Sequence, residues 1–322
     1  MLISDLPSQL AIPVVVSECV ASKVMLDLTV YLVEPSEQEL EFLIELYESV
    51  CPPDRWLNYK IDEIEYWVPL AQPQLTLSGR SAAAAGIKRP YLEPVRRRIR
   101  DGRAFEIQFW DGQPIDSEGS WSFSCRRIHL RSTGLHAFVR FLIPLKADYQ
   151  ILRRVASAIA DNVEIYSGHG GLVFVYNPWF KEDAFDAIYA RARRFWGVDV
   201  EDLNDTLPLM KKGIKGVNWI TLLGNRFTTE SEVQGNLSLL RNVPDVTIDR
   251  RQHAIVLIAG HQPVIGDRNR PDHSLDPYHV IANALKPLFL EAHPDFPSER
   301  FIKNGNTVGW IRRLIEPSGW CR

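Results

Sequence analysis

The sequence predicts an α+β fold, in which helices flank a mostly antiparallel sheet. Strand-like runs gather in groups and do not alternate regularly with helices, an arrangement typical of this class. Hydrophobic residues make up 45% and charged residues 24% of the 322 residues, as in an ordinary globular protein. No linker rich in glycine or serine separates the predicted elements, so residues 1–322 are expected to form a single domain.

The first predicted elements are a strand and a helix. Apolar residues alternate with mostly polar ones over residues 24–32, which is the period of a half-buried strand. Ser36 and Glu39 have the spacing of a capping box, in which each side chain satisfies a free backbone N–H group at the start of a helix. The apolar stripe over residues 40–47 predicts that this helix packs along one side.

Three further strand-like runs are predicted to form an antiparallel meander, at residues 105–110, 121–130 and 137–145. The segments between them are short and polar and contain glycine, which suits direct connections between neighbouring antiparallel strands. A helix is expected before the meander at residues 91–100. Another is expected after it, with an apolar face over residues 149–159.

A second strand and helix pair is predicted in the middle of the chain. Residues 172–176 form a short apolar run, and Asn177 and Pro178 suit the start of a helix. The likeness of this pair to the first suggests two similar halves. Further strands are predicted at residues 246–248 and 254–259.

The most enzyme-like segment is residues 166–171, which contain His169. A His-Gly-Gly turn can direct backbone N–H groups at an oxyanion, so a hydrolase that uses His169 is one alternative function. The chain has no G-x-S-x-G motif to supply the matching nucleophile. We therefore favour a glycine-rich turn that leads into the strand at residues 172–176.

No metal or cofactor site is predicted. The four cysteines are widely spaced and lack a C-x-x-C pair, which favours buried reduced thiols. His273, Asp276 and His279 are three residues apart, a spacing that brings side chains to one face of a helix. Asp276 with Pro277 is better interpreted as the capped start of that helix, which leaves His273 outside it.

The whole chain has a net charge of −3, and two charged clusters lie in its first third. Arginines gather at residues 96–103, which makes a nucleic-acid-binding regulator a second alternative function. A helix would spread these arginines around its circumference, so we favour a solvated helix or pairing with acids elsewhere. The other cluster is acidic, and it is either the solvated back of the first helix or a surface for a basic partner.

Four motifs in a fixed order, over residues 163–288, resemble a known family. They are Gly170–Tyr176 with Arg194–Val200, then Ile214–Gly224, Ile255–Arg270 and Tyr278–Leu288. This pattern is similar to that of the TsiV-type immunity proteins of bacterial type VI secretion systems. Ile265 and Arg268 depart from the leucine and valine that are commoner in that family.

The resemblance implies a non-enzymatic protein that binds a cognate effector toxin, often a nuclease, and covers its active or substrate-binding surface. Asn218 and Trp219 of the second motif are expected to anchor the core, because a buried indole contributes a large apolar area. A nuclease toxin acts in the cytoplasm, and the N-terminal residues lack the basic start and long apolar core of a secretory signal. We therefore expect a cytoplasmic protein that contacts neither membrane nor nucleic acid directly.

The acidic cluster is the first candidate for the effector-binding surface. Its side chains, on and after the first helix, are expected to point to solvent, where complementary charge raises the rate of association. The predicted partner-binding residues are Glu37, Glu41, Glu45, Glu48, Asp62, Glu63 and Glu65. The segments at residues 111–119 and 199–212 are the second candidate.

Overall fold

The computed structural model describes residues 10, 14–16, 19–62, 66–112, 120–130, 134–229, 231–270 and 273–320. The strands are β1 (Val14–Val16), β2 (Cys19–Leu32), β3 (Asn58–Ile61), β4 (Val68–Pro69), β5 (Phe105–Trp110), β6 (Ser122–Leu130), β7 (Gly134–Ile143), β8 (Ile165–Tyr176), β9 (Val198–Val200), β10 (Ile220–Gly224), β11 (Val246–Arg250) and β12 (Ala254–Ala259). The helices are α2 (Glu37–Val50), α3 (Leu77–Ala84), α4 (Glu93–Arg100), α5 (Gln150–Asn162), α6 (Lys181–Ala192), α7 (Leu203–Thr206), α8 (Asn225–Thr228), α9 (Ser231–Leu239), α10 (Asp276–Ala284), α11 (Glu299–Ile302), α12 (Asn306–Ile311) and α13 (Pro317–Trp320).

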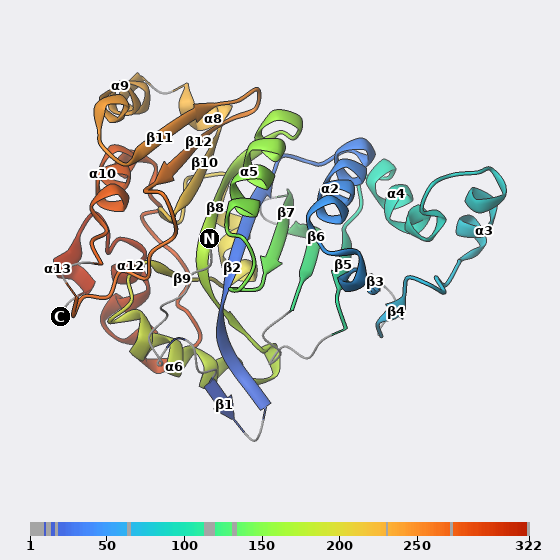
Figure 1. Cartoon of the computed structure of the whole chain (residues 1–322), viewed down its shortest axis with the longest axis horizontal. Helices are drawn as coiled ribbons and strands as arrows, with labels where there is room; N and C mark the ends of the chain where they lie inside the picture. The colour runs from blue at the N-terminus through green and yellow to red at the C-terminus, as the bar shows by residue number, and fades with distance from the viewer. Residues whose placement is uncertain are drawn as a thin grey trace.

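The described strands all lie in one sheet (Figure 1). Their order is β11-β12-β10-β8-β2-β7-β6-β5-β3-β4, with β1 paired to β2 and β9 paired to β8. Each pair of these strands is antiparallel except β8 and β9, which are parallel. The predicted α+β class with a mostly antiparallel sheet is therefore confirmed.

Strand β2 lies at the centre of the sheet, between β7 and β8, and is longer than predicted. All of its residues from Val20 to Leu32 are buried, so the prediction of a half-buried strand is wrong. Helix α5 contacts one face of β2, while Leu207, Met210 and Leu290 pack against Tyr31 on the other. A strand that is covered on both faces can still show an alternating sequence when its polar side chains pair with each other.

Helix α2 begins where the capping box predicts. The Ser36 hydroxyl accepts a hydrogen bond from the Glu39 N–H at 3.2 Å, and the Glu39 carboxylate accepts one from the Ser36 N–H at 2.8 Å. On its buried side, the ring of Tyr47 lies 5.4 Å from the ring of Phe123 in β6. Helices α2 and α5 lie next to each other over one face of the sheet (Figure 1), which we call the helix-covered face.

The predicted meander is confirmed, since β5 pairs with β6 and β6 pairs with β7, both antiparallel. Buried and half-buried side chains alternate along β5. Phe109 is buried on the helix-covered face, where its ring is stacked 6.2 Å from that of Tyr47. Glu106, Gln108 and Trp110 are half-buried on the opposite face and line an open hollow.

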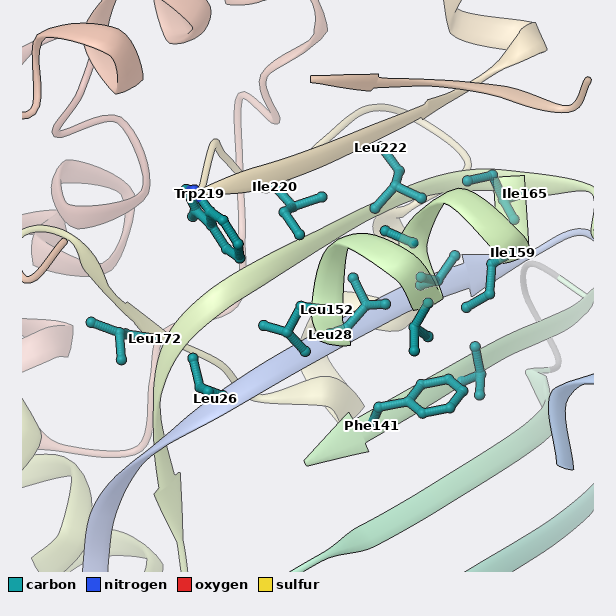
Figure 2. Packing of buried hydrophobic residues seen from close by; sticks show 14 of the residues in the cluster. Leu26, Leu28, Phe141, Leu152, Ile159, Ile165, Leu172, Trp219, Ile220 and Leu222 are labelled. Atoms are coloured by element: carbon teal, nitrogen blue, oxygen red, sulfur yellow. The ribbon is translucent and has the colours of Figure 1, made fainter. Parts of the chain in front are cut away.

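The main core lies between α5 and the central strands (Figure 2). Leu152 and Ile159 of α5 are fully buried, and in Figure 2 they point toward the strands that carry Leu28, Ile220 and Leu222. The apolar face predicted over residues 149–159 is therefore the one that binds the helix to the sheet.

Two local predictions need correction. Residues 166–171 continue β8 and do not form a turn. Asp276 is the first residue of α10, and Leu275 occupies the cap position without a side-chain hydrogen bond. His273 lies outside this helix, as predicted.

The described cysteines are free thiols. Cys51 and Cys125 are buried, as expected, and burial raises the pKa of Cys51 to about 11 and that of Cys125 to about 12. Cys19 is exposed, contrary to expectation, because it is the first residue of β2 at the rim of the sheet. Cys321 lies outside the described residues.

Candidate functional site

Four ionisable side chains meet on the face of the sheet opposite α2 and α5. His169 in β8 pairs with Thr29 of β2. Leu28, the neighbour of Thr29, faces the helices (Figure 2), so Thr29 and His169 face the opposite side of the sheet. Asp199 lies in β9, Glu201 directly follows it, and Lys215 precedes β10. We call His169, Asp199, Glu201 and Lys215 the buried ionic cluster.

The contacts within the buried ionic cluster are short. Nε2 of His169 lies 3.2 Å from Asp199 Oδ2 and 3.0 Å from Glu201 Oε2. The Lys215 ammonium lies 2.8 Å from Asp199 Oδ2, donates to the Val200 carbonyl at 3.0 Å and also contacts the Glu201 carboxylate. Each charged group therefore has a partner of opposite charge within the cluster.

The side chains of the cluster are buried, each with an exposed fraction of 8% or less, so their contacts with one another replace contacts with water. Burial alone would raise the pKa of Glu201, but the charge of Lys215 and the hydrogen bond from His169 hold it well below its ordinary value. Burial alone would lower the pKa of Lys215, but the charges of Asp199 and Glu201 raise it. The Glu201 carboxylate and the Lys215 ammonium thus stay charged together inside the protein.

The cluster also contains metal-ligand chemistry. His169, Asp199 and Glu201 each offer one ligand atom, and these atoms lie within 4.8 Å of one another. Lys215 already places a positive charge against both carboxylates. A metal ion would have to enter beside that ammonium, so the residues fit a self-contained ion-pair network better than a metal site.

The strand position of His169 removes the basis for an oxyanion-binding turn. A Cβ on Gly168 would lie 2.9 Å from the Thr29 carbonyl oxygen, and one on Gly170 would lie 2.8 Å from Leu28 Cδ1. The glycines therefore allow β8 to pack closely against β2. Strand β8 is paired with β2 and β10 at this point, so its backbone donors belong to a sheet ladder.

Asn218 and Trp219 anchor the start of β10, as the resemblance led us to expect. The Asn218 side-chain oxygen accepts a hydrogen bond from the Trp219 N–H at 2.7 Å. Trp219 is fully buried, its ring lies 5.4 Å edge-on to that of Tyr149, and its indole N–H donates to the Gly260 carbonyl at 3.2 Å. Gly171 leaves the room that Asn218 needs, since a Cβ there would lie 2.4 Å from Asn218 Oδ1.

A second contact joins two of the quoted motifs. The Arg194 guanidinium donates two parallel hydrogen bonds of 2.7 Å to the Asp267 carboxylate. The Gly197 N–H donates to the Ile265 carbonyl at 2.9 Å, and a Cβ on Gly197 would lie 2.0 Å from the Val264 carbonyl oxygen. The motif residues therefore hold β8, β9, β10 and the loop after β12 together.

The acidic cluster on α2 faces the arginines on and before α4. The Glu41 carboxylate contacts both Arg89, at 2.9 Å, and Arg96. Five more pairs join the two clusters among the described residues: Lys88–Glu45 at 2.6 Å, Arg89–Glu45 at 3.5 Å, Arg89–Glu48, Arg100–Glu37 at 2.9 Å and Arg98–Asp62 at 3.2 Å. Pairing with acids elsewhere in the chain, one of the two possibilities that we favoured, is confirmed for Arg96, Arg98 and Arg100.

These pairs change how far the predicted partner-binding side chains reach into solvent. The exposed side-chain fraction is 50% for Glu45 but only 25% for Glu41 and 27% for Glu48. The expectation that all three point to solvent is therefore wrong for Glu41 and Glu48, because buried guanidinium groups hold them. Glu63 and Glu65 lie outside the described residues.

The histidines near α10 do not form a site in the part of the chain that the structure describes. His279 Nδ1 lies 2.7 Å from the Leu314 carbonyl oxygen, a contact that ties α10 to the C-terminal segment. Among the described residues, the group of side chains that could ligate a metal is the one around His169. The sequence did hint at this group through Lys215, an ammonium inside a largely apolar run, but not at its partners.

Comparison with known proteins identifies the family. The family profile TsiV, described as type VI immunity for VRR-NUC, matches residues 67–314. This chain belongs to the TsiV family. The TsiV match contains the buried ionic cluster and every motif that carries the resemblance.

A solved structure has a similar fold. The Pseudomonas aeruginosa T6SS protein PA0821 is similar to this chain with a TM-score of 0.70 and 20% sequence identity. The alignment covers 96% of this chain and 90% of that chain. The search of curated proteins found no match. No helix in the described ranges has the length and apolar character needed to cross a bilayer.

Proposed function

We propose that this TsiV protein is a stoichiometric inhibitor that binds a nuclease effector of a type VI secretion system. It covers the active or substrate-binding surface of the nuclease and acts in the cytoplasm, where nucleic acid is the target. The family match over residues 67–314 is the observation that carries this proposal. The protein has no catalytic role of its own in this proposal.

The geometry around His169 supports a non-enzymatic role. Its Nε2 contacts two carboxylates that already pair with Lys215, and its side chain is 7% exposed. A general base needs hydrogen-bond access to a nucleophile or a substrate, and this site offers little room for either. Of the arginines proposed for the nucleic-acid-binding alternative, Arg96 and Arg100 pair with α2 and Arg98 pairs with Asp62, so these side chains do not form a contiguous basic face.

The test uses the purified chain and the purified nuclease effector encoded next to its gene. We expect a one-to-one complex with Kd at nanomolar or below, about −12 kcal/mol, because an inhibitor must hold its toxin at low concentration. Cleavage of plasmid DNA by the effector should stop at equimolar inhibitor. An effector that stays active and unbound would contradict the proposal, as would a hydrolase activity of this chain that His169→Ala abolishes.

A further inference from the structure

A broad hollow lies on the face of the sheet opposite α2 and α5. It has a volume of about 670 Å³, and 23 residues line it. It extends across the sheet from Lys60 in β3 to the segment after β8. These strands are five spacings apart in the sheet order, or about 24 Å. We call this hollow the sheet groove.

The lining of the sheet groove mixes polar and apolar side chains. Phe138 and Leu142 of β7 are apolar, while Gln108, Ser122 and Ser124 of the neighbouring strands are polar and half-buried. A surface that is permanently covered is more apolar, because it resembles a protein core. This composition therefore fits a partner that also exists in the free state.

Tryptophans stand at both ends of the sheet groove. Trp67 and Trp110 lie at the β3 end, with ring centroids 5.2 Å apart. Trp179 lies at the β8 end, in the short helical turn Pro178–Phe180, and is 90% exposed. Tryptophan is enriched among the residues that contribute most to protein binding. An indole this exposed has no packing role in the isolated chain.

The accessible charge of the sheet groove is positive, although the whole chain carries −3. Lys60 has no ion-pair partner among the residues that the structure describes. Arg126 is 35% exposed, and its Nε lies 3.9 Å from the Glu106 carboxylate. Arg140 pairs with the buried Asp27 at 2.7 Å and adds no free charge. The charge left uncompensated thus favours carboxylates on the incoming partner.

We propose that the sheet groove is the docking surface for the nuclease effector and receives a convex, carboxylate-bearing segment of it. This inference rests on the proposed function. The length of the groove, about 24 Å, and the exposed indole of Trp179 suit a segment of a protein partner. A nucleic acid fits less well, because tight phosphate binding uses on the order of 6–10 phosphate contacts and the groove offers few cations.

The experiment measures affinity for the purified effector by calorimetry, with three groove variants. Trp179→Ala removes the exposed indole, Lys60→Glu reverses the free charge, and Ser124→Arg fills the hollow. Each should raise Kd by about 30-fold or more, which is the effect of losing a binding hot spot. The matched controls are Leu239→Ala, 74% exposed on α9, and Arg241→Glu, exposed near β11. They should bind like wild type, and thermal melting checks that every variant folds.

The outcomes separate this inference from the proposed function. If wild type binds the effector and all three folded groove variants bind equally well, the groove assignment is wrong and the inhibitor function stands. If wild type does not bind the effector, both fall. A groove variant that keeps the effector but loses a single-stranded DNA 20-mer, or loses a self-dimer seen by size exclusion, would also overturn the inference.

Discussion

The ammonium of Lys215 lies 2.8 Å from Asp199 Oδ2 in the interior of the protein, and both side chains are at most 8% exposed. Lys215 comes 16 residues after Asp199 in the sequence. The contact therefore ties β9 to the approach of β10, on the covered part of the face that carries the sheet groove. Its removal should affect the fold first.

Lys215→Met should destabilise the protein by about 3–5 kcal/mol, because it leaves Asp199 and Glu201 charged, buried and without their cation. Urea unfolding at pH 7.5 measures the change. The double variant Lys215→Met with Glu201→Gln removes one of the uncompensated charges and should recover part of the loss. Equal stability of wild type and Lys215→Met would show that the cluster is not the close-packed ion-pair network described above.

Stability should fall as the pH drops below about 6.5, the ordinary pKa of histidine. His293 is buried, with Nε2 3.1 Å from the Thr206 hydroxyl, and burial lowers its pKa in the folded state. The unfolded chain then binds the proton more readily, so the contribution of neutral His293 is present above pH 6.5 and lost as the pH falls. The slope can reach about 1.4 kcal/mol per pH unit. Chemical unfolding between pH 7.5 and 5.5 measures it.

The control for this pH dependence is His293→Gln, which cannot take up the proton. Its stability should change less over the same range. A second loss is expected below pH 4.5 in both proteins, because the pKa of Glu201 is lowered in the folded state and protonation again favours the unfolded chain. Identical slopes above pH 5.5 in the two proteins would exclude His293 as the cause.

Gly171→Ala should cost about 1–3 kcal/mol, since the new methyl group would overlap the Asn218 side chain that fixes the start of β10. The matched control is Gly235→Ala in α9, where a Cβ meets nothing within 4 Å. That change should be neutral or stabilise by up to about 1 kcal/mol, because alanine is the better helix former. Thermal melts of both variants are compared with wild type. A lower melting temperature for Gly171→Ala alone supports close packing at Gly171, and an unchanged one contradicts it.

Reversing Glu41, Glu45 and Glu48 to lysine together cannot test the acidic surface cleanly. Glu41 lies between two buried arginines, so Glu41→Lys should itself destabilise by about 2 kcal/mol or more. Glu45→Lys should change stability by less than about 1 kcal/mol, because Glu45 is half exposed.

Glu45→Lys is therefore the informative variant for the predicted acidic interface. Stopped-flow association with the effector at low and high salt should show a slower rate and a weaker salt dependence if this surface takes part. An unchanged rate, together with weaker binding by the groove variants, would place the interface on the sheet groove alone.

Local patterns in the sequence were enough to predict most of the elements. The capping box at Ser36 and Glu39, the meander and the apolar face of α5 each show as a spacing or a period of residues close in the chain, so the sequence reveals them. The motifs likewise identified the family, which the profile match confirms.

Only the tertiary structure decided which charges meet. Glu41 and Arg96 lie 55 residues apart, and Asp27 and Arg140 lie 113 apart, so no periodicity links them. The surroundings of His169 were also not evident from the sequence, because its glycine neighbours suggested a turn. The structure shows that these glycines lie in β8, where a larger side chain would collide with β2. The sheet groove is of this kind too, because a hollow depends on which strands become neighbours and which face the helices leave uncovered. Long-range pairing of strands determines both, and one sequence does not display it.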